Sequence, residues 1–261
     1  MRKILGCLTI ALLVGCMSPE RAERNLVKAM LALDRTFIPA WTLTGPNDEG
    51  DSAPAVHALL QEWAYFKARF YYYERQDTSW QTALDRVEIG LLQAEELDTS
   101  GNQLAAHASL DEVRSIFVAL RDSNGIEYFL DGLIAFQGPL EAIVSLVRGR
   151  TAGNLANRQV NAIRGLFPEV RARWSSVRDW LFDPSLHNFD EQQVARLNEQ
   201  IALENNALDI LEQALGSGSR NSIIVAAQGI EPEFDRLYRL FGDFPPPARE
   251  NVTPQEATRT D

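Results

Sequence analysis

The residues with the clearest potential for metal or acid–base chemistry are three histidines, His57, His107 and His187. His107 and Asp111 are four residues apart, so on a helix they share a face and lie one turn from each other. An imidazole and a carboxylate placed in this way form half of a metal site in a helical bundle. The sequence has no Glu-x-x-His motif of the di-iron kind, and the alternative is that His107 is solvated near a helix start or pairs with Asp111.

A single carboxylate interrupts the apolar face of a predicted helix over residues 194–215. Glu204 occupies the position between Ile201 and Leu208 at helical spacing, so we expect its side chain to be buried. A buried carboxylate needs a partner or has a raised pKa, and both situations occur at functional sites as well as in structural ion pairs. The candidate partners are Arg114, Arg171 and Arg173.

The motifs of the common enzyme classes do not occur in the sequence. No Ser/His/Asp arrangement is suggested by the few histidines. The glycine-rich segment 216–219 lacks the lysine of a phosphate-binding loop and follows a helical pattern rather than a strand. We therefore predict a non-enzymatic protein without catalytic residues. A hydrolase would require a deep cleft around Glu204 with a second carboxylate opposite.

The elements that position these residues are predicted to be helices throughout. Apolar residues recur at alternating steps of three and four, as on one face of an amphipathic helix. The segments with this spacing cover residues 20–43, 56–70, 80–94, 106–120, 129–147, 160–181, 194–215 and 223–241. Most end at glycine, asparagine or proline, and short helices joined so tightly pack antiparallel. We predict an all-α antiparallel bundle array of about seven to eight helices, with a loop over residues 45–54 and a disordered, proline-rich tail over residues 244–261.

Prolines recur inside three of the apolar patterns, at Pro39, Pro139 and Pro232. An internal period of this kind indicates repeated supersecondary units. We interpret the body of the chain as two tandem related helical units, residues 29–135 and 136–243, that share one core. A proline inside a helix removes a hydrogen bond and bends the helix, so the matched prolines predict kinks around that core.

The N-terminus has the features of a secretory signal peptide. Basic residues are followed by the apolar stretch 4–14, which at about 11 residues is too short to span a bilayer. The sequence Leu13-Val14-Gly15-Cys16 resembles the bacterial lipobox, in which a small residue precedes a cysteine. The resemblance implies that residues 1–15 are cleaved and that Cys16 receives a diacylglycerol on its thiol and an acyl chain such as palmitate on its new amine. Residues 16–28 would then form a lipidated N-terminus and tether.

The resemblance to lipoproteins also implies a location. In bacteria with two membranes, an aspartate directly after the lipidated cysteine tends to retain the protein in the inner membrane, and here that position is Met17. We therefore expect the protein in the bacterial cell envelope, anchored at the outer membrane and facing the periplasm. Two or three acyl chains give an anchor that a single chain cannot.

Composition restricts the partners of the mature protein. Cleavage would remove Arg2 and Lys3 and no acidic residue, so the formal charge changes from −11 to −13. This acidic balance argues against nucleic-acid binding and against a domain that lies flat on anionic lipid, so we expect the domain to stand off the membrane. Cys16 would be the only remaining cysteine, which excludes an intrachain disulfide.

These observations favour a membrane-anchored lipoprotein with a non-enzymatic helical domain. The domain would bind an envelope protein or a small ligand, and we predict no cofactor other than the covalent lipid on Cys16. The alternative is a metal- or haem-binding bundle that uses His107 and nearby carboxylates. For haem, the sequence has no Cys-x-x-Cys-His motif, and only Met17 and Met30 would be left as methionine ligands.

Overall fold

The computed structural model describes residues 19–46, 50–73 and 78–244. Within these residues the chain forms nine α-helices and no strand, which confirms the all-α prediction. The predicted signal peptide, Cys16, Met17 and the predicted tail from residue 245 onward lie outside the described residues. The helices are α1 (Pro19–Leu43), α2 (Ala53–Phe70), α3 (Thr78–Thr99), α4 (Gln103–Ser123), α5 (Phe129–Val147), α6 (Asn157–Arg178), α7 (Pro184–His187), α8 (Glu191–Ser217) and α9 (Arg220–Arg239).

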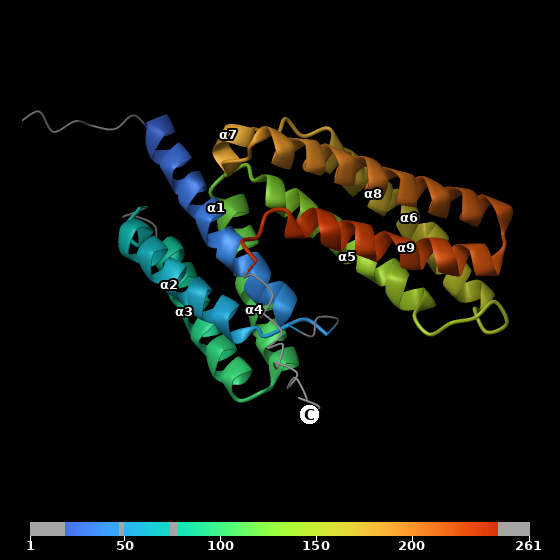
Figure 1. Cartoon of the computed structure of the whole chain (residues 1–261), viewed down its shortest axis with the longest axis horizontal. Helices are drawn as coiled ribbons and strands as arrows, with labels where there is room; N and C mark the ends of the chain where they lie inside the picture. Colours follow the sequence, from blue (N-terminus) through green and yellow to red (C-terminus); the bar gives the residue numbers. More distant parts are fainter. Residues whose placement is uncertain (1–18, 47–49, 74–77, 245–261) are drawn as a thin grey trace, which may run out of the picture.

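The helices form two groups of four that pack against each other (Figure 1). In the first group α1 packs on α2, α2 on α3 and α3 on α4. In the second group α5 contacts α6 and α9, and α8 contacts α6 and α9. Along the chain, the first group ends with α4 and the second begins with α5. The boundary predicted between residues 135 and 136 falls inside α5, which also contains Pro139.

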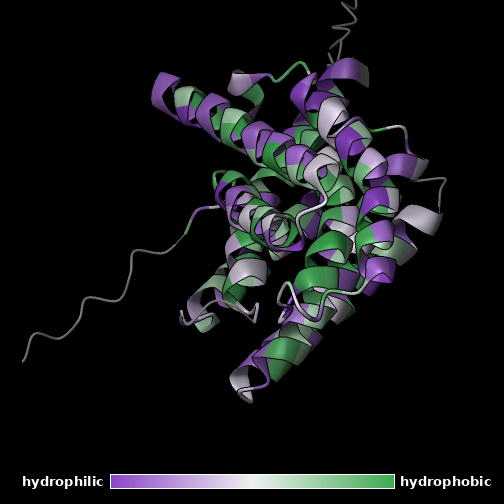
Figure 2. Ribbon diagram, turned by 90° about the vertical axis from the view of Figure 1, so that its right-hand side faces the viewer, coloured by the Kyte–Doolittle hydropathy of each residue, from purple (hydrophilic) through white to green (hydrophobic). Residues whose placement is uncertain are grey.

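Amphipathic faces build one continuous core through both groups. Figure 2 shows hydrophilic and hydrophobic residues alternating along the helices, as one-sided burial requires. α5 differs from this pattern because it is apolar on most of its surface. It is the only described helix that is long and apolar enough to cross a membrane, judged by length and composition alone. Its side chains Leu133, Phe136 and Ile143 are fully buried. Its contacts with α6 and α9 make it the central helix of the second group.

A proline in α1 creates the attachment point for the end of α9. Pro39 has no N–H, so it cannot bond to the carbonyl of Arg35 one turn earlier. That carbonyl instead accepts the N–H of Asp243 at 2.8 Å. The adjacent Gly242 fits because a Cβ at this position would lie only 2.9 Å from the Pro39 ring. The C-terminal end of α9 is thereby fixed onto the C-terminal third of α1.

A buried charge network links α1, α4 and α5 at the junction of the two groups. Arg121 donates hydrogen bonds of 2.8 and 2.5 Å to the two carboxylate oxygens of Asp131, and its guanidinium lies 4.2 Å from the ring centre of Tyr128. The Tyr128 hydroxyl donates to Asp34. Burial raises the pKa of Asp34 to about 6, while nearby Arg121 acts in the opposite direction. These contacts hold the two groups in one relative position.

Candidate ligand-binding cleft

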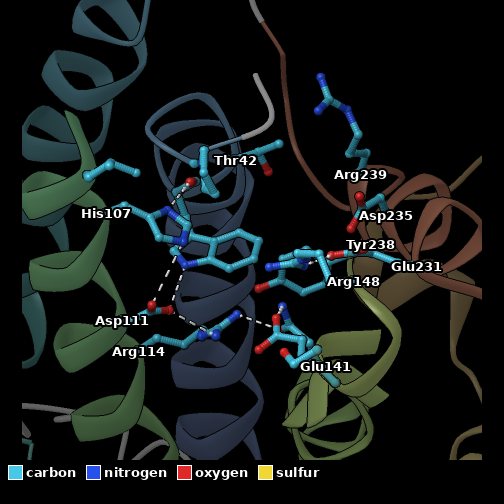
Figure 3. A pocket seen from close by; sticks show the side chains of 16 residues that line it. Thr42, His107, Asp111, Arg114, Glu141, Arg148, Glu231, Asp235, Tyr238 and Arg239 are labelled. Carbon is cyan, nitrogen blue, oxygen red and sulfur yellow. Dashed lines mark hydrogen bonds and ion pairs between the residues drawn. The ribbon is translucent and has the colours of Figure 1, made fainter. Parts of the chain in front are cut away.

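A cleft of about 360 Å³ lies where the two helix groups meet, between α1 and α4 on one side and α5 and α9 on the other (Figure 3). Its walls carry aromatic side chains and charges of both signs. The lining residues that carry this chemistry are Trp41, His107, Asp111, Arg114, Gln137, Glu141, Arg148, Glu231, Asp235, Tyr238 and Arg239. Residues of α1, α4, α5 and α9 therefore contribute to one site.

The first wall is a bonded cluster around Trp41, near the end of α1. The indole N–H donates to the carboxylate of Asp111 at 2.7 Å, and the same oxygen accepts from Arg114 at 3.0 Å. The Arg114 guanidinium lies 4.4 Å from the Trp41 ring centre, and Tyr238 meets the indole edge-on at 5.7 Å. Trp41 is thus held rigidly, with 9 % of its surface exposed.

His107 and Asp111 lie together in this wall, one turn apart on α4. The carbonyl of Trp41 can only accept, so His107 donates from Nδ1 to it, at 2.8 Å. His107 Nε2 then lies 3.8 Å from the Asp111 carboxylate. The imidazole therefore joins α4 to the end of α1 and turns its second nitrogen toward the carboxylate.

No third side chain completes a metal site with this pair. Within the described residues, no group of three or more His, Cys, Asp or Glu side chains is arranged to hold a metal ion. His57 is exposed on α2 and bonds to Gln61 at 2.9 Å. His187 is buried at the end of α7, where burial and the nearby charge of Arg35 lower its pKa to about 4.

The second wall carries carboxylates from α5 and α9. Glu141 accepts a hydrogen bond of 2.6 Å from Gln137, and Glu231 accepts one of 3.4 Å from Arg148. The walls of the cleft reduce the hydration of these carboxylates, although the carboxylates remain open to solvent on one side. Desolvation, then repulsion from Glu231, raises the pKa of Asp235 to about 6. The pKa of Glu141 is also raised, mainly by desolvation.

The sequence interpretation missed this acidic wall, although a signal for it was present. Glu231 and Asp235 are four residues apart on α9, so two like charges share one helix face at a cost in stability. Such a repulsive pair is tolerated where a site requires it. The convergence of α9 with Glu141 on α5 could not be read from spacing, because it depends on tertiary packing.

Glu204 is fully buried on α8, at the position that the apolar stripe assigns to it. Neither carboxylate oxygen has a hydrogen-bond partner in the part of the chain that the structure describes. Burial, reinforced by the charges of Glu233 and Asp235, raises its pKa to about 9. Glu204 is therefore protonated at neutral pH, and it is not among the residues that line the cleft.

The arginines expected as partners of Glu204 are bonded elsewhere. Arg114 binds Asp111 and Gln137 in the cleft. Arg171 forms ion pairs with Asp209 and Glu212, and Arg173 forms one with Glu169. Among the described residues Glu204 has no ion pair, because these arginines bind carboxylates that stay partly exposed to water, whereas an ionised Glu204 would have to be fully desolvated.

Comparisons with known proteins give no assignment. No protein-family model matches the chain, and no match was found among curated proteins or solved structures.

Proposed function

We propose that this protein is a lipid-anchored lipoprotein of the bacterial cell envelope, and that its helical domain binds a small polar ligand in the cleft without catalysing a reaction. The observation that carries the proposal is the cleft itself, where four helices of two groups place aromatic and charged side chains around one space. The lipobox pattern ending at Cys16 supports the membrane anchor.

The volume of the cleft suits a small molecule. Ligand pockets usually measure roughly 300–1,000 Å³, and 360 Å³ lies near the lower limit. The Trp41 wall is rigid before a ligand arrives, because its indole is bonded to Asp111 and covered by Arg114. A preformed wall lowers the conformational cost of binding.

The charges in the cleft favour a ligand with a cationic group. All three of its arginines already interact with protein groups: Arg114 with Asp111, Arg148 with Glu231, and Arg239 with the ring of Phe244 and the charge of Asp235. Desolvation raises the pKa of Glu141 and of Asp235, and the negative charge of Glu231 adds to both increases by repulsion. A bound cation would relieve this repulsion, so we expect amines or quaternary ammonium compounds to bind in preference to anions of the same size.

Calorimetric titration can test this ligand class directly. The probes are choline, putrescine and spermidine, with succinate as the anionic comparison. Asp235→Asn should weaken the binding of a cationic probe about tenfold, equivalent to about 1.4 kcal/mol. The control is Glu199→Gln, which removes an exposed carboxylate from α8 outside the cleft. Binding of succinate alone, or equal binding by both variants, would contradict the proposal.

The anchor is tested separately by labelling cells with radioactive palmitate. Wild type should carry the label and Cys16→Ser should not; a labelled Cys16→Ser variant would exclude lipidation at Cys16. Metal analysis and an absorption spectrum of the purified protein distinguish the alternative. A stoichiometric metal or a Soret band would favour a metal or haem function through His107.

A further inference from the structure

The helical domain begins almost directly after the proposed lipid. α1 starts at Pro19, and only Met17 and Ser18 separate it from Cys16. A chain extends at most about 3.6 Å per residue, so the Cα atoms of Cys16 and Pro19 are within about 11 Å of each other. Residues 19–28, the larger part of the predicted tether, belong to α1, and Leu26 is fully buried in the core.

A loop from the second helix group lies beside the start of α1. Arg24 on α1 is 3.6 Å from the carboxylate of Asp183 and donates to the Ser185 hydroxyl at 3.5 Å. Asp183 caps α7, which packs along α1 (Figure 1). The segment 179–183 between α6 and α7 therefore lies close to the end of the molecule at which the lipid would be attached.

This loop exposes two large apolar side chains at its tip. Leu181 is 95 % exposed, more than any other large apolar side chain in the described residues, and Trp180 is 36 % exposed. They are supported from behind by an aromatic cluster, since Trp180 contacts the ring of Phe129 at 6.2 Å and Phe129 contacts Phe182 at 5.3 Å. Trp180 and Leu181 therefore form an apolar corner that is held on the folded domain by the ring contacts of Trp180 and Phe182.

We propose that Trp180 and Leu181 insert into the interfacial region of the membrane that holds the lipid of Cys16. This inference rests on the proposed lipid anchor. Tryptophan is enriched at membrane interfaces because its ring is amphipathic, and a leucine beside it adds apolar area that water would otherwise cover. The anchor supplies the proximity, and the apolar corner fixes the orientation of the domain.

This orientation directs the ligand cleft away from the membrane. Trp41 follows Pro19 by 22 residues on α1, a distance of about 33 Å along the helix axis. With the start of α1 and the Trp180–Leu181 corner at the membrane, the cleft would open toward the aqueous side. Ligands would therefore reach it from solution.

Quenching of tryptophan fluorescence by brominated phospholipids tests the inference on the mature lipidated protein in vesicles. The chain has five tryptophans, and Trp41, Trp63, Trp80 and Trp174 are each at most 9 % exposed. Trp180 is therefore the fluorophore that bromine atoms at the interface can reach. We expect a loss of roughly one fifth of the emission, the share of one tryptophan in five.

Two variants and one control identify the source of the loss. Trp180→Phe should abolish the quenching, and Leu181→Ser should reduce it by at least half. Ile89→Ser should leave it unchanged, because Ile89 is an equally apolar, 65 % exposed residue on α3 outside this corner.

Flotation of the vesicles separates the two proposals. Protein that floats with the vesicles but shows no quenching of Trp180 would overturn the inserted corner and leave the lipid anchor intact. Wild-type protein that does not float would overturn the anchor, and with it the inference.

Discussion

Replacement of Glu204 by glutamine is expected to stabilise the protein at neutral pH and to flatten the pH dependence of its stability. Glu204 is fully buried on α8 and has no hydrogen-bond partner among the described residues. Burial raises its pKa from 4.5 to about 9. Glutamine has the shape of the protonated carboxyl group and cannot ionise, so it removes the titration and keeps the packing.

The sign and size of the effect come from proton linkage. Between pH 4.5 and about 9 the native state keeps a proton that the unfolded state has released, so wild-type stability falls as the pH rises. Each pH unit in this window lowers the free energy of unfolding by about 1.4 kcal/mol. At pH 7 the free energy of unfolding of the wild type is therefore about 3 kcal/mol lower than below pH 4.5. Glu204→Gln does not titrate and so avoids this decrease.

Urea unfolding of both proteins at pH 5, 7 and 8 measures this difference. We expect stabilities within about 1 kcal/mol of each other at pH 5 and an advantage of about 3 kcal/mol for Glu204→Gln at pH 7. For a domain of this size such an advantage raises Tm by roughly 6–12 °C. Glu199→Gln should follow the wild type. If Glu204→Gln is no more stable than wild type at pH 7, Glu204 is ionised with a partner and the reasoning is refuted.

Three further predictions concern the junction and the cleft. Gly242→Ala should lower Tm in thermal unfolding because the new Cβ would lie 2.9 Å from the Pro39 ring, and an unchanged Tm would contradict this packing. Asp131→Asn should lower the free energy of unfolding in urea by about 3 kcal/mol, because the buried Arg121 loses its ionic partner; a loss under 1 kcal/mol would show that Arg121 is compensated otherwise. Calorimetry of a cationic ligand should show affinity falling about tenfold from pH 7 to pH 5 as Asp235, with a pKa of about 6, becomes protonated, and a flat profile would exclude its role.

Periodicity in the sequence predicts those features that depend on a single helix. The helical segments follow the apolar spacing, and α1 corresponds to the segment 20–43. The burial of Glu204 follows from the same spacing. A residue between Ile201 and Leu208 on the apolar face of α8 points to the core, regardless of which helices pack against that face. His107 and Asp111 share a face for the same reason.

Features that depend on how helices pair could not be obtained in this way. The spacing on α9 shows that Glu231 and Asp235 repel each other, but not that Glu141 on α5 faces them across a cleft. Arg114, one of three candidate partners of Glu204, instead pairs with Asp111 on its own helix, which stays partly exposed and loses less hydration than a buried carboxylate.

The acidic charge of the chain would limit how the proposed lipoprotein touches an anionic membrane. With the proposed cleavage after residue 15 the formal charge is −13, which repels such a surface and makes a broad contact unfavourable. The side chains of Trp180 and Leu181 carry no charge, and the preceding Asp179 is paired with Arg178, so this corner would meet less repulsion than a broad face of the domain. The same repulsion on the rest of the surface would hold α1 away from the membrane plane. The proposed lipid, the Trp180–Leu181 corner and the net charge together favour one orientation, in which α1 would lead from the membrane to the cleft and its carboxylates would face cations in solution.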